Sequence, residues 1–221
     1  MSARRRRLLV ALLLACGGCE VPLMPPTHTS EFYEFRLDIT PPRVLRWESG
    51  TTIRVHAMPG SAARAGILEG ALDRGMRMWN AHALYGEYEL IRAASVAEAD
   101  VVLQWSDEVP PVDVAECPPQ LSRAVTTFCL DDSGRHLHRF PLATGASSVR
   151  MLVTVLGSEA ARGDRVDRLV SHELGHVLGI ARHSAAASDL MFGGELTRAT
   201  LTARDAATLR MLYHTRPDVT P

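Results

Sequence analysis

The 221-residue sequence predicts one α/β (α+β) domain of about 170 residues, and three observations predict it. Apolar side chains recur at intervals of three and four residues in several long stretches, which is typical of helices that bury one face. Short runs rich in valine and leucine lie before and between these stretches, as expected of buried strands. A domain of this length can also bury an adequate core, about 70% of the surface that the unfolded chain exposes.

The expected elements follow one another in a definite order along the chain. An extended segment covers residues 45–55, and a long amphipathic helix covers residues 63–84. Short buried strands are expected at residues 99–105 and 149–156. A final helix begins after Thr202, whose side-chain oxygen suits the N-cap position.

The beginning of the chain has the pattern of a secretory signal peptide. Four arginines at residues 4–7 precede an apolar run that is too short to span a membrane. The sequence Leu-Leu-Ala-Cys at residues 13–16 resembles a bacterial lipobox, which implies cleavage before Cys16 and acylation of that cysteine. Cys19 is a weaker candidate, and a plain secretory signal is the alternative. An acylated Cys16 would anchor the protein to a membrane of the bacterial cell envelope, outside the cytoplasm.

The same features divide the chain into three parts. Residues 1–15 are the expected lipoprotein signal peptide, and residues 16–45 are rich in proline and are expected to form a semi-extended membrane tether. Residues 46–216 are the expected folded domain. Loss of the four N-terminal arginines leaves 20 basic residues against 25 acidic ones, a net charge of −5 in place of −1, which argues against a nucleic-acid partner.

Two further cysteines, Cys117 and Cys129, form a natural pair in an oxidising compartment. A disulfide between them would close a short loop and stabilise the fold by roughly 3 kcal/mol in the loop-entropy model. The alternative is two free, buried thiols.

The run His-Glu-Leu-Gly-His at residues 172–176 carries the chemistry of the chain. Two histidines four residues apart lie on the same face of a helix, so His172 and His176 can bind one metal ion together. A catalytic zinc site takes three protein ligands and keeps one position for water, and Glu173 can serve as the general base that takes a proton from that water. Asp164 or Asp167 could start this helix.

A third ligand is expected just beyond the end of this helix. Gly179 can adopt a left-handed C-terminal turn, which directs the chain away from the helix axis. His183 can then return to the same metal ion. The alternatives for the third ligand are Asp189, Glu195 or water alone.

These residues resemble the metzincin zinc peptidases, whose pattern is His-Glu-x-x-His-x-x-Gly-x-x-His followed by a methionine turn. Arg182 stands where the third histidine falls in that pattern, and His183 follows one place later. The sequence Ser-Asp-Leu-Met-Phe at residues 188–192 resembles the methionine turn, with Met191 as its methionine. The interval from His183 to Met191 is similar to that of matrix-metalloproteinase-type members. The deviation is therefore one extra residue after Gly179, which adds at most about 3.6 Å of reach and can be absorbed in a loop.

The resemblance covers residues 46–214 apart from 109–148, and it implies a metzincin-like zincin domain. In that fold a twisted mixed sheet carries a long first helix, an active-site helix and a C-terminal helix. It also implies a substrate strand along a sheet edge within residues 123–142 and a specificity-pocket wall within residues 184–196. Zn²⁺ would be held by His172, His176 and His183, above Met191.

The function that follows is a zinc-dependent endopeptidase in which Glu173 activates a metal-bound water to hydrolyse peptide bonds. Its expected partners are a peptide or protein substrate and, through the lipid anchor, a membrane. The alternative is a non-catalytic lipoprotein of the same fold, zinc-binding or metal-free, that binds a peptide or an envelope partner. The presence of Glu173 favours the enzyme, because a binding protein has no need of the base.

Overall fold

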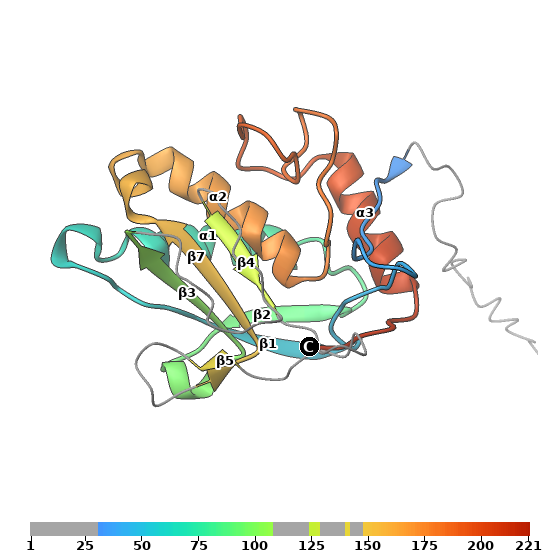
Figure 1. Cartoon of the computed structure of the whole chain (residues 1–221), viewed down its shortest axis with the longest axis horizontal. Helices are drawn as coiled ribbons and strands as arrows, with labels where there is room; N and C mark the ends of the chain where they lie inside the picture. The colour runs from blue at the N-terminus through green and yellow to red at the C-terminus, as the bar shows by residue number, and fades with distance from the viewer. Residues whose placement is uncertain (1–30, 108–123, 129–139, 142–147) are drawn as a thin grey trace, which may run out of the picture.

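The computed structural model of the chain describes residues 31–107, 124–128, 140–141 and 148–221. Its centre is a five-stranded mixed sheet with the strand order β2-β1-β3-β7-β4 (Figure 1). Neighbouring strands run parallel except at the β4 edge, where β4 is antiparallel to β7. The strands of this sheet are β1 (Thr51–Ala57), β2 (Tyr88–Arg92), β3 (Val101–Ser106), β4 (Ala124–Thr127) and β7 (Met151–Leu156).

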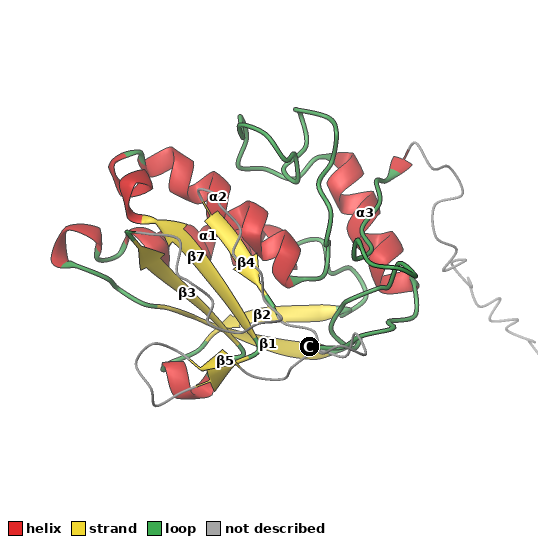
Figure 2. Cartoon of the chain, in the orientation of Figure 1, coloured by secondary structure: helices red, strands yellow, loops and turns green. Residues whose placement is uncertain are grey.

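Three α-helices complete the mixed α/β fold among the described residues. Two of them, α1 and α2, pack against each other over one face of the sheet, and α3 lies to one side (Figure 2). A two-stranded sheet of β5 and β6 accompanies the main sheet. The bounds are α1 (Ile67–Asn80), α2 (Gly163–Val177), α3 (Ala203–His214), β5 (Phe140–Pro141) and β6 (Ser148–Val149), with short 3-10 turns at Ala62–Arg64, Val96–Glu98 and Gly157–Ala161.

The core lies mainly between the helices and the sheet. Alternate residues of β3 show the two faces: Val101 and Leu103 belong to the main core with both helices, whereas Val102 packs with Val149 in a small second cluster. Trp47 and Trp79 are among the largest fully buried side chains of the main core. The α/β prediction is therefore confirmed, and the sheet presents one well-covered face on which α2 is held.

Some elements differ from their expected bounds. The first helix is shorter than residues 63–84, because Gly66 has a positive φ of 77° and separates it from the preceding 3-10 turn. Strand β2 was not predicted, since its burial alternates over only five residues. Thr202 is the N-cap of α3, as expected, and forms a capping box with Asp205.

The packed domain begins before residue 46. Phe35 and Leu45 are 1% and 0% exposed and belong to the main core, and Leu45 forms a bridge with Val219 near the other end of the chain. Residues 31–45, expected to be part of a semi-extended tether, are therefore part of the folded domain, and the expected boundary at residue 216 is also too early. In the same stretch, the amide and the hydroxyl of Tyr33 donate hydrogen bonds to Thr208 and Asp205 of the last helix.

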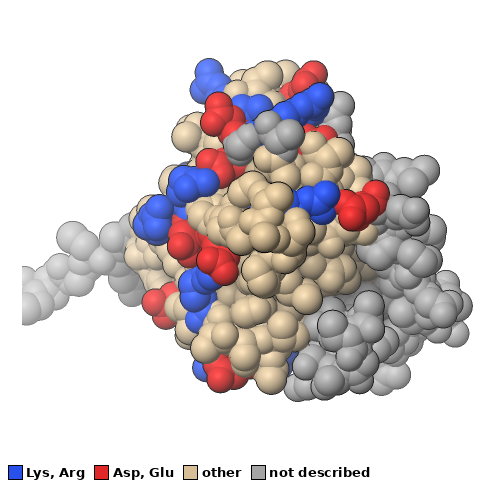
Figure 3. All heavy atoms as spheres, turned by 90° about the vertical axis from the view of Figure 1, so that its left-hand side faces the viewer, with Lys and Arg blue, Asp and Glu red and all other residues tan. Residues whose placement is uncertain are grey.

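Several expectations fall outside the described residues. These are the signal peptide, Cys16, and the pair Cys117 and Cys129. Within the described ranges, no helix combines the length and the hydropathy needed to cross a membrane. On the face shown in Figure 3, arginine and acidic side chains are interspersed. The ion pair of Arg74 with Asp167 joins α1 to α2.

Candidate metal centre

Helix α2 presents two histidines on one face, and two buried tryptophans fix its position. The indole Nε1 of Trp79 donates a hydrogen bond to the carbonyl of Ser171 at 2.8 Å, and that of Trp47 donates to the carbonyl of Val177 at 2.7 Å. The second bond satisfies one of the carbonyls that a helix leaves unpaired at its C-terminus. The two carbonyls that accept these bonds flank His172 and His176 in the sequence, so the helix face that carries the two histidines is held in place from both ends.

The start of α2 is different from the expected one. The helix begins after Arg162, which makes no side-chain cap, and Asp164 lies inside the first turn rather than before it. Asp167 forms an ion pair with Arg74 of α1 at 2.5 Å. Neither aspartate is an N-cap, but Asp164 still places a negative charge near the positive end of the helix dipole.

The end of α2 confirms the role expected of Gly179. Its φ is 111°, and a Cβ added there would lie 2.2 Å from the carbonyl oxygen of Leu45, so the position requires glycine. The amides of Gly179 and Ile180 donate to the carbonyls of His176 and Gly175, both at 3.0 Å, which is the pattern of a Schellman motif. This turn directs Ile180 back toward the metal-facing side of the helix.

The extra residue between Gly179 and His183 is absorbed by contacts with the N-terminal segment. The amide of Ala181 donates to the carbonyl of Phe35 at 2.9 Å. The guanidinium of Arg182 pairs with the carboxylate of Asp38 and bonds the carbonyl of Arg36. Arg182 therefore does not compete for the metal position, and the chain that follows it brings His183 back to the helix.

The three histidines converge on one point. The Nε2 atom of His176 lies 3.2 Å from the Nε2 atoms of both His172 and His183. The ring centroids form a nearly equilateral triangle with sides of 4.9, 5.0 and 5.1 Å. Two nitrogen ligands of a tetrahedral zinc ion, each about 2.0–2.1 Å from the metal, lie roughly 3.3 Å apart, so the spacing fits such an ion.

Hydrogen bonds on the far side of two rings fix their tautomers. Nδ1 of His172 donates to the carbonyl of Leu190 at 2.7 Å, and Nδ1 of His176 donates to the carbonyl of Ile180 at 2.5 Å. A carbonyl can only accept, so the proton of each neutral ring is on Nδ1 and the Nε2 lone pair is free. Two lone pairs facing each other at 3.2 Å repel unless a cation lies between them. The arrangement therefore suits a metal ion.

The imidazoles are held neutral. Burial, followed by the nearby His176, lowers the pKa of His172 to about 4, and burial with the nearby His183 lowers the pKa of His176 to about 4. Burial also lowers the pKa of His183, which is the most exposed of the three. At neutral pH all three rings can donate a lone pair without first losing a proton.

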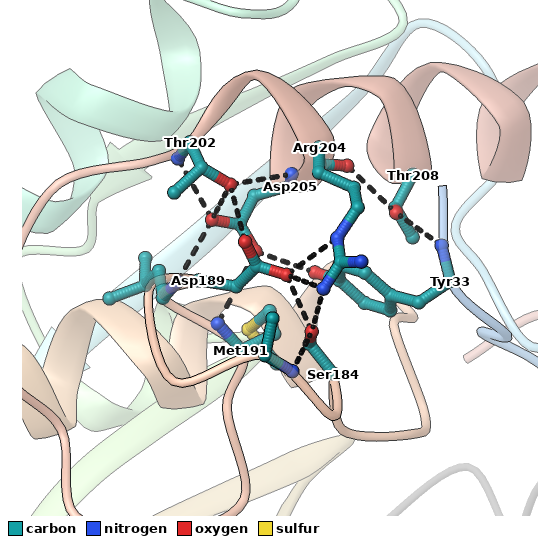
Figure 4. A network of polar contacts seen from close by, with 10 residues as sticks. Tyr33, Ser184, Asp189, Met191, Thr202, Arg204, Asp205 and Thr208 are labelled. Atoms are coloured by element: carbon teal, nitrogen blue, oxygen red, sulfur yellow. Dashed lines mark hydrogen bonds and ion pairs between the residues drawn. The ribbon is translucent and has the colours of Figure 1, made fainter. Parts of the chain in front are cut away.

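The other expected candidates for the third ligand are engaged elsewhere. Asp189 accepts hydrogen bonds from Ser184 at 2.5 Å and Thr202 at 3.0 Å and pairs with Arg204 at 2.5 Å (Figure 4). The carboxylate of Glu195 lies 3.5 Å from Arg165. Among the described residues, the three histidines form the one group of side chains close enough to hold a metal ion.

The turn that contains Met191 lies beneath the histidines and is held by α3. Asp205, which is fully buried, accepts hydrogen bonds from the amides of Leu190 at 2.9 Å and Met191 at 3.3 Å (Figure 4). Met191 is fully buried against Gly175, where an added Cβ would lie 2.3 Å from its sulfur. Sequence reasoning missed these roles of Asp205 and Gly175, because the local motifs that contain them, the capping box and the His-Glu-Leu-Gly-His run, do not indicate a contact with Met191.

Glu173 lies beside the histidines and is almost completely buried. Burial raises the pKa of its carboxyl group, and this effect is opposed by the nearby His172 and by hydrogen bonds from Thr126. The hydroxyl of Thr126, on the edge strand β4, lies 2.7 Å from Oε2 of Glu173. A carboxylate in this setting has a raised proton affinity, which a general base requires.

A cavity of about 580 Å³ connects these groups. All three histidines and Glu173 line it, so the converging nitrogens are accessible from outside. The cavity extends along α2 and past the segment that follows Met191. Other residues of its wall are Thr126, Phe128, Leu169, Phe192, Gly193 and Leu196.

The arrangement can hold a metal ion with three neutral imidazoles, next to a buried carboxylate and within reach of a molecule in the cavity. No protein-family model matches the chain, and no curated protein is significantly similar to it.

Proposed function

We propose that the protein is a metzincin-like zinc endopeptidase of the bacterial cell envelope, anchored through an acylated Cys16. The observation that carries the proposal is the convergence of three Nε2 atoms beside the buried carboxylate of Glu173, within one open cavity. His172, His176 and His183 would hold the zinc ion. A bound zinc ion would polarise the substrate carbonyl and lower the pKa of a water molecule to about 7.

The other roles in the proposed reaction fall to residues of the protein itself: proton transfer, orientation of the histidines and support of the site. Glu173 takes the proton from the attacking water and passes it to the leaving amine, for which its raised proton affinity is suited. The carbonyls of Leu190 and Ile180 hold His172 and His176 in the metal-binding tautomer. Met191 packs against α2 and forms the apolar floor beneath the site.

The substrate would lie along the edge of the main sheet. Strand β4 lies at that edge within the expected segment 123–142, and Thr126 of β4 lines the same cavity as the histidines. An extended peptide can add to such an edge by β-augmentation. Leu169, Phe192 and Leu196 supply an apolar wall for the substrate side chain next to the scissile bond.

The test is the substitution Glu173→Gln in the zinc-loaded, full-length protein. The variant should keep stoichiometric zinc, measured by mass spectrometry of the metal, and should lose nearly all cleavage of a broad peptide library. Glu89→Gln, an exposed carboxylate of β2, is the matched control and should cleave like the wild type. Full activity of Glu173→Gln would exclude the mechanism.

The non-catalytic alternative has its own outcome. If the wild type binds zinc through the three histidines but leaves every peptide of the library intact, with and without a chelator, the protein is a binding protein. His183→Ala then serves as the test of the third ligand, since loss of one of three ligands should weaken zinc binding by at least about 10-fold.

A further inference from the structure

We propose that Thr126 is a positioning residue that fixes the catalytic orientation of the Glu173 carboxylate from the edge strand β4. The inference rests on the proposed peptidase function and adds to it a residue on a different element from the metal ligands. Thr126 is separated from Glu173 by 47 residues, and the contact forms only because α2 crosses the β4 edge of the sheet.

The hydroxyl of Thr126 contacts two oxygen atoms of Glu173. Oγ1 of Thr126 lies 2.7 Å from Oε2 of Glu173 and 3.1 Å from the backbone carbonyl of the same residue. A hydroxyl has one proton to donate, and the shorter contact is to the charged oxygen, which makes the stronger hydrogen bond. The hydroxyl thus lies between the backbone and the carboxylate of one residue, and it fixes the direction of the side chain relative to the helix.

The hydrogen bond to Oε2 determines which oxygen of Glu173 can accept a proton from the attacking water. With Oε2 accepting from the Thr126 hydroxyl, we expect the second oxygen, Oε1, to be the one that accepts the proton of the water. A glutamate has several rotatable bonds, so an unrestrained carboxylate would occupy orientations in which neither oxygen faces the metal position. A loss of orientation of this kind lowers the rate of the chemical step more than it lowers substrate affinity.

The backbone of the edge strand keeps the hydroxyl in place. Thr126 pairs with Val153 of β7 in antiparallel register, and β7 is a largely buried inner strand of the sheet. A β-branched side chain has few χ1 rotamers, so the hydroxyl is directed toward Glu173 at little further entropic cost. Valine has nearly the same shape as threonine and lacks only the hydroxyl, so it removes the hydrogen bond of the hydroxyl and keeps the strand and the backbone hydrogen bond of residue 126 to Glu173.

The experiment compares Thr126→Val with Thr126→Ser in the zinc-loaded, full-length protein. The substrate is a fluorogenic form of a peptide that the wild type cleaves. We expect Thr126→Val to lower kcat by about 10- to 100-fold, the effect of losing one hydrogen bond to a charged group, with KM within about 2-fold of the wild type. Thr126→Ser should restore kcat to within about 3-fold, since it keeps the hydroxyl. Zinc content should be unchanged in both.

Each remaining outcome is decisive. A Thr126→Val variant with the wild-type kcat and full zinc overturns the inference and leaves the peptidase proposal intact. Equal loss in both variants, or loss of zinc, shows a structural role and also overturns it. If the zinc-loaded wild type cleaves no peptide, both proposals fail, and the wild-type measurement alone identifies this case.

Discussion

The carboxylate of Asp205 accepts a hydrogen bond from the amide of Leu190 at 2.9 Å, and the carbonyl of Leu190 in turn accepts from Nδ1 of His172 at 2.7 Å. One peptide segment therefore links the first turn of α3 to a candidate metal ligand. Tyr33 adds to the same carboxylate, since its hydroxyl donates to Asp205 at 2.8 Å (Figure 4). The orientation of His172 thus depends on a residue that lies 33 positions further along the chain.

Replacement of Asp205 by alanine tests this link. The change leaves the buried amides of Leu190 and Met191 without their acceptor, which should lower the free energy of unfolding by about 3 kcal/mol. It should also weaken zinc binding by roughly 10- to 100-fold, as expected for loss of a group that orients a ligand. Urea unfolding and competition with a zinc chelator measure the two effects. Glu89→Ala, on the exposed face of β2, should change neither, and normal zinc affinity in Asp205→Ala would contradict the link.

Gly175→Ala tests how closely Met191 packs beneath the histidines. Alanine favours a helix over glycine by about 1 kcal/mol, but here its Cβ would lie 2.3 Å from the sulfur of Met191 and 2.9 Å from the ring of Trp79. Overpacking should prevail and lower the free energy of unfolding by about 1–3 kcal/mol.

The matched control for this change is Gly70→Ala in α1. There the added Cβ meets only the flexible guanidinium of Arg74, at 3.2 Å. The substitution should therefore be neutral or stabilise the protein by up to about 1 kcal/mol. Thermal unfolding of both variants checks the pair. A more stable Gly175→Ala protein would show that Met191 can move aside.

The zinc-free protein should become less stable in acid because of His172 and His176. The pKa of each is lowered by burial to about 4 in the folded state, whereas an unfolded histidine titrates near about pH 6.5. The unfolded chain therefore binds protons first as the pH falls, and stability should decrease from about pH 6.5 down to about pH 4.

The measurement is best made in the Glu173→Gln background. The raised pKa of Glu173 acts in the opposite direction, since the folded state then binds a proton more readily than the unfolded chain. Urea unfolding of this variant between about pH 7 and pH 4 should show a steep loss of stability. Adding His172→Asn and His176→Asn should flatten that dependence, and an equally steep curve would assign the acid sensitivity to other groups.

The site residues that could be predicted from the sequence are those that lie close to one another along the chain. His172, Glu173 and His176 lie within one helical turn, and Gly179 follows where the helix must end, so the period of the helix determines their arrangement. His183 could also be predicted, because a short loop after Gly179 can bring it back to the other two histidines. The contacts that hold these residues could not be predicted in the same way. Thr126, Asp205 and Phe35 reach the site only through the tertiary fold, and no short pattern links them to it.

The fold shows the same division. The amphipathic helices and the runs of buried β-branched residues were predictable from periodicity, but the packing of residues 31–45 was not, since the prolines there favour an extended linker. Phe35 is 1% exposed, its carbonyl accepts from the amide of Ala181 beyond the end of α2, and the amide of the nearby Tyr33 bonds Thr208 of α3. Its burial is therefore a property of the assembled domain.

The hydrogen bond from Ala181 to Phe35 has a consequence for the order of events during synthesis. It joins residues 146 positions apart, and the contact of Asp205 with Leu190 requires α3 as well. A nascent chain that has only just released α2 from the ribosome contains His172 and His176. It still lacks Ala181, which holds the loop before His183, and Asp205, which holds the Leu190 segment that orients His172. Contacts of such long range form late in folding. The complete site is therefore assembled only after the last helix has been synthesised and the two ends of the domain have met.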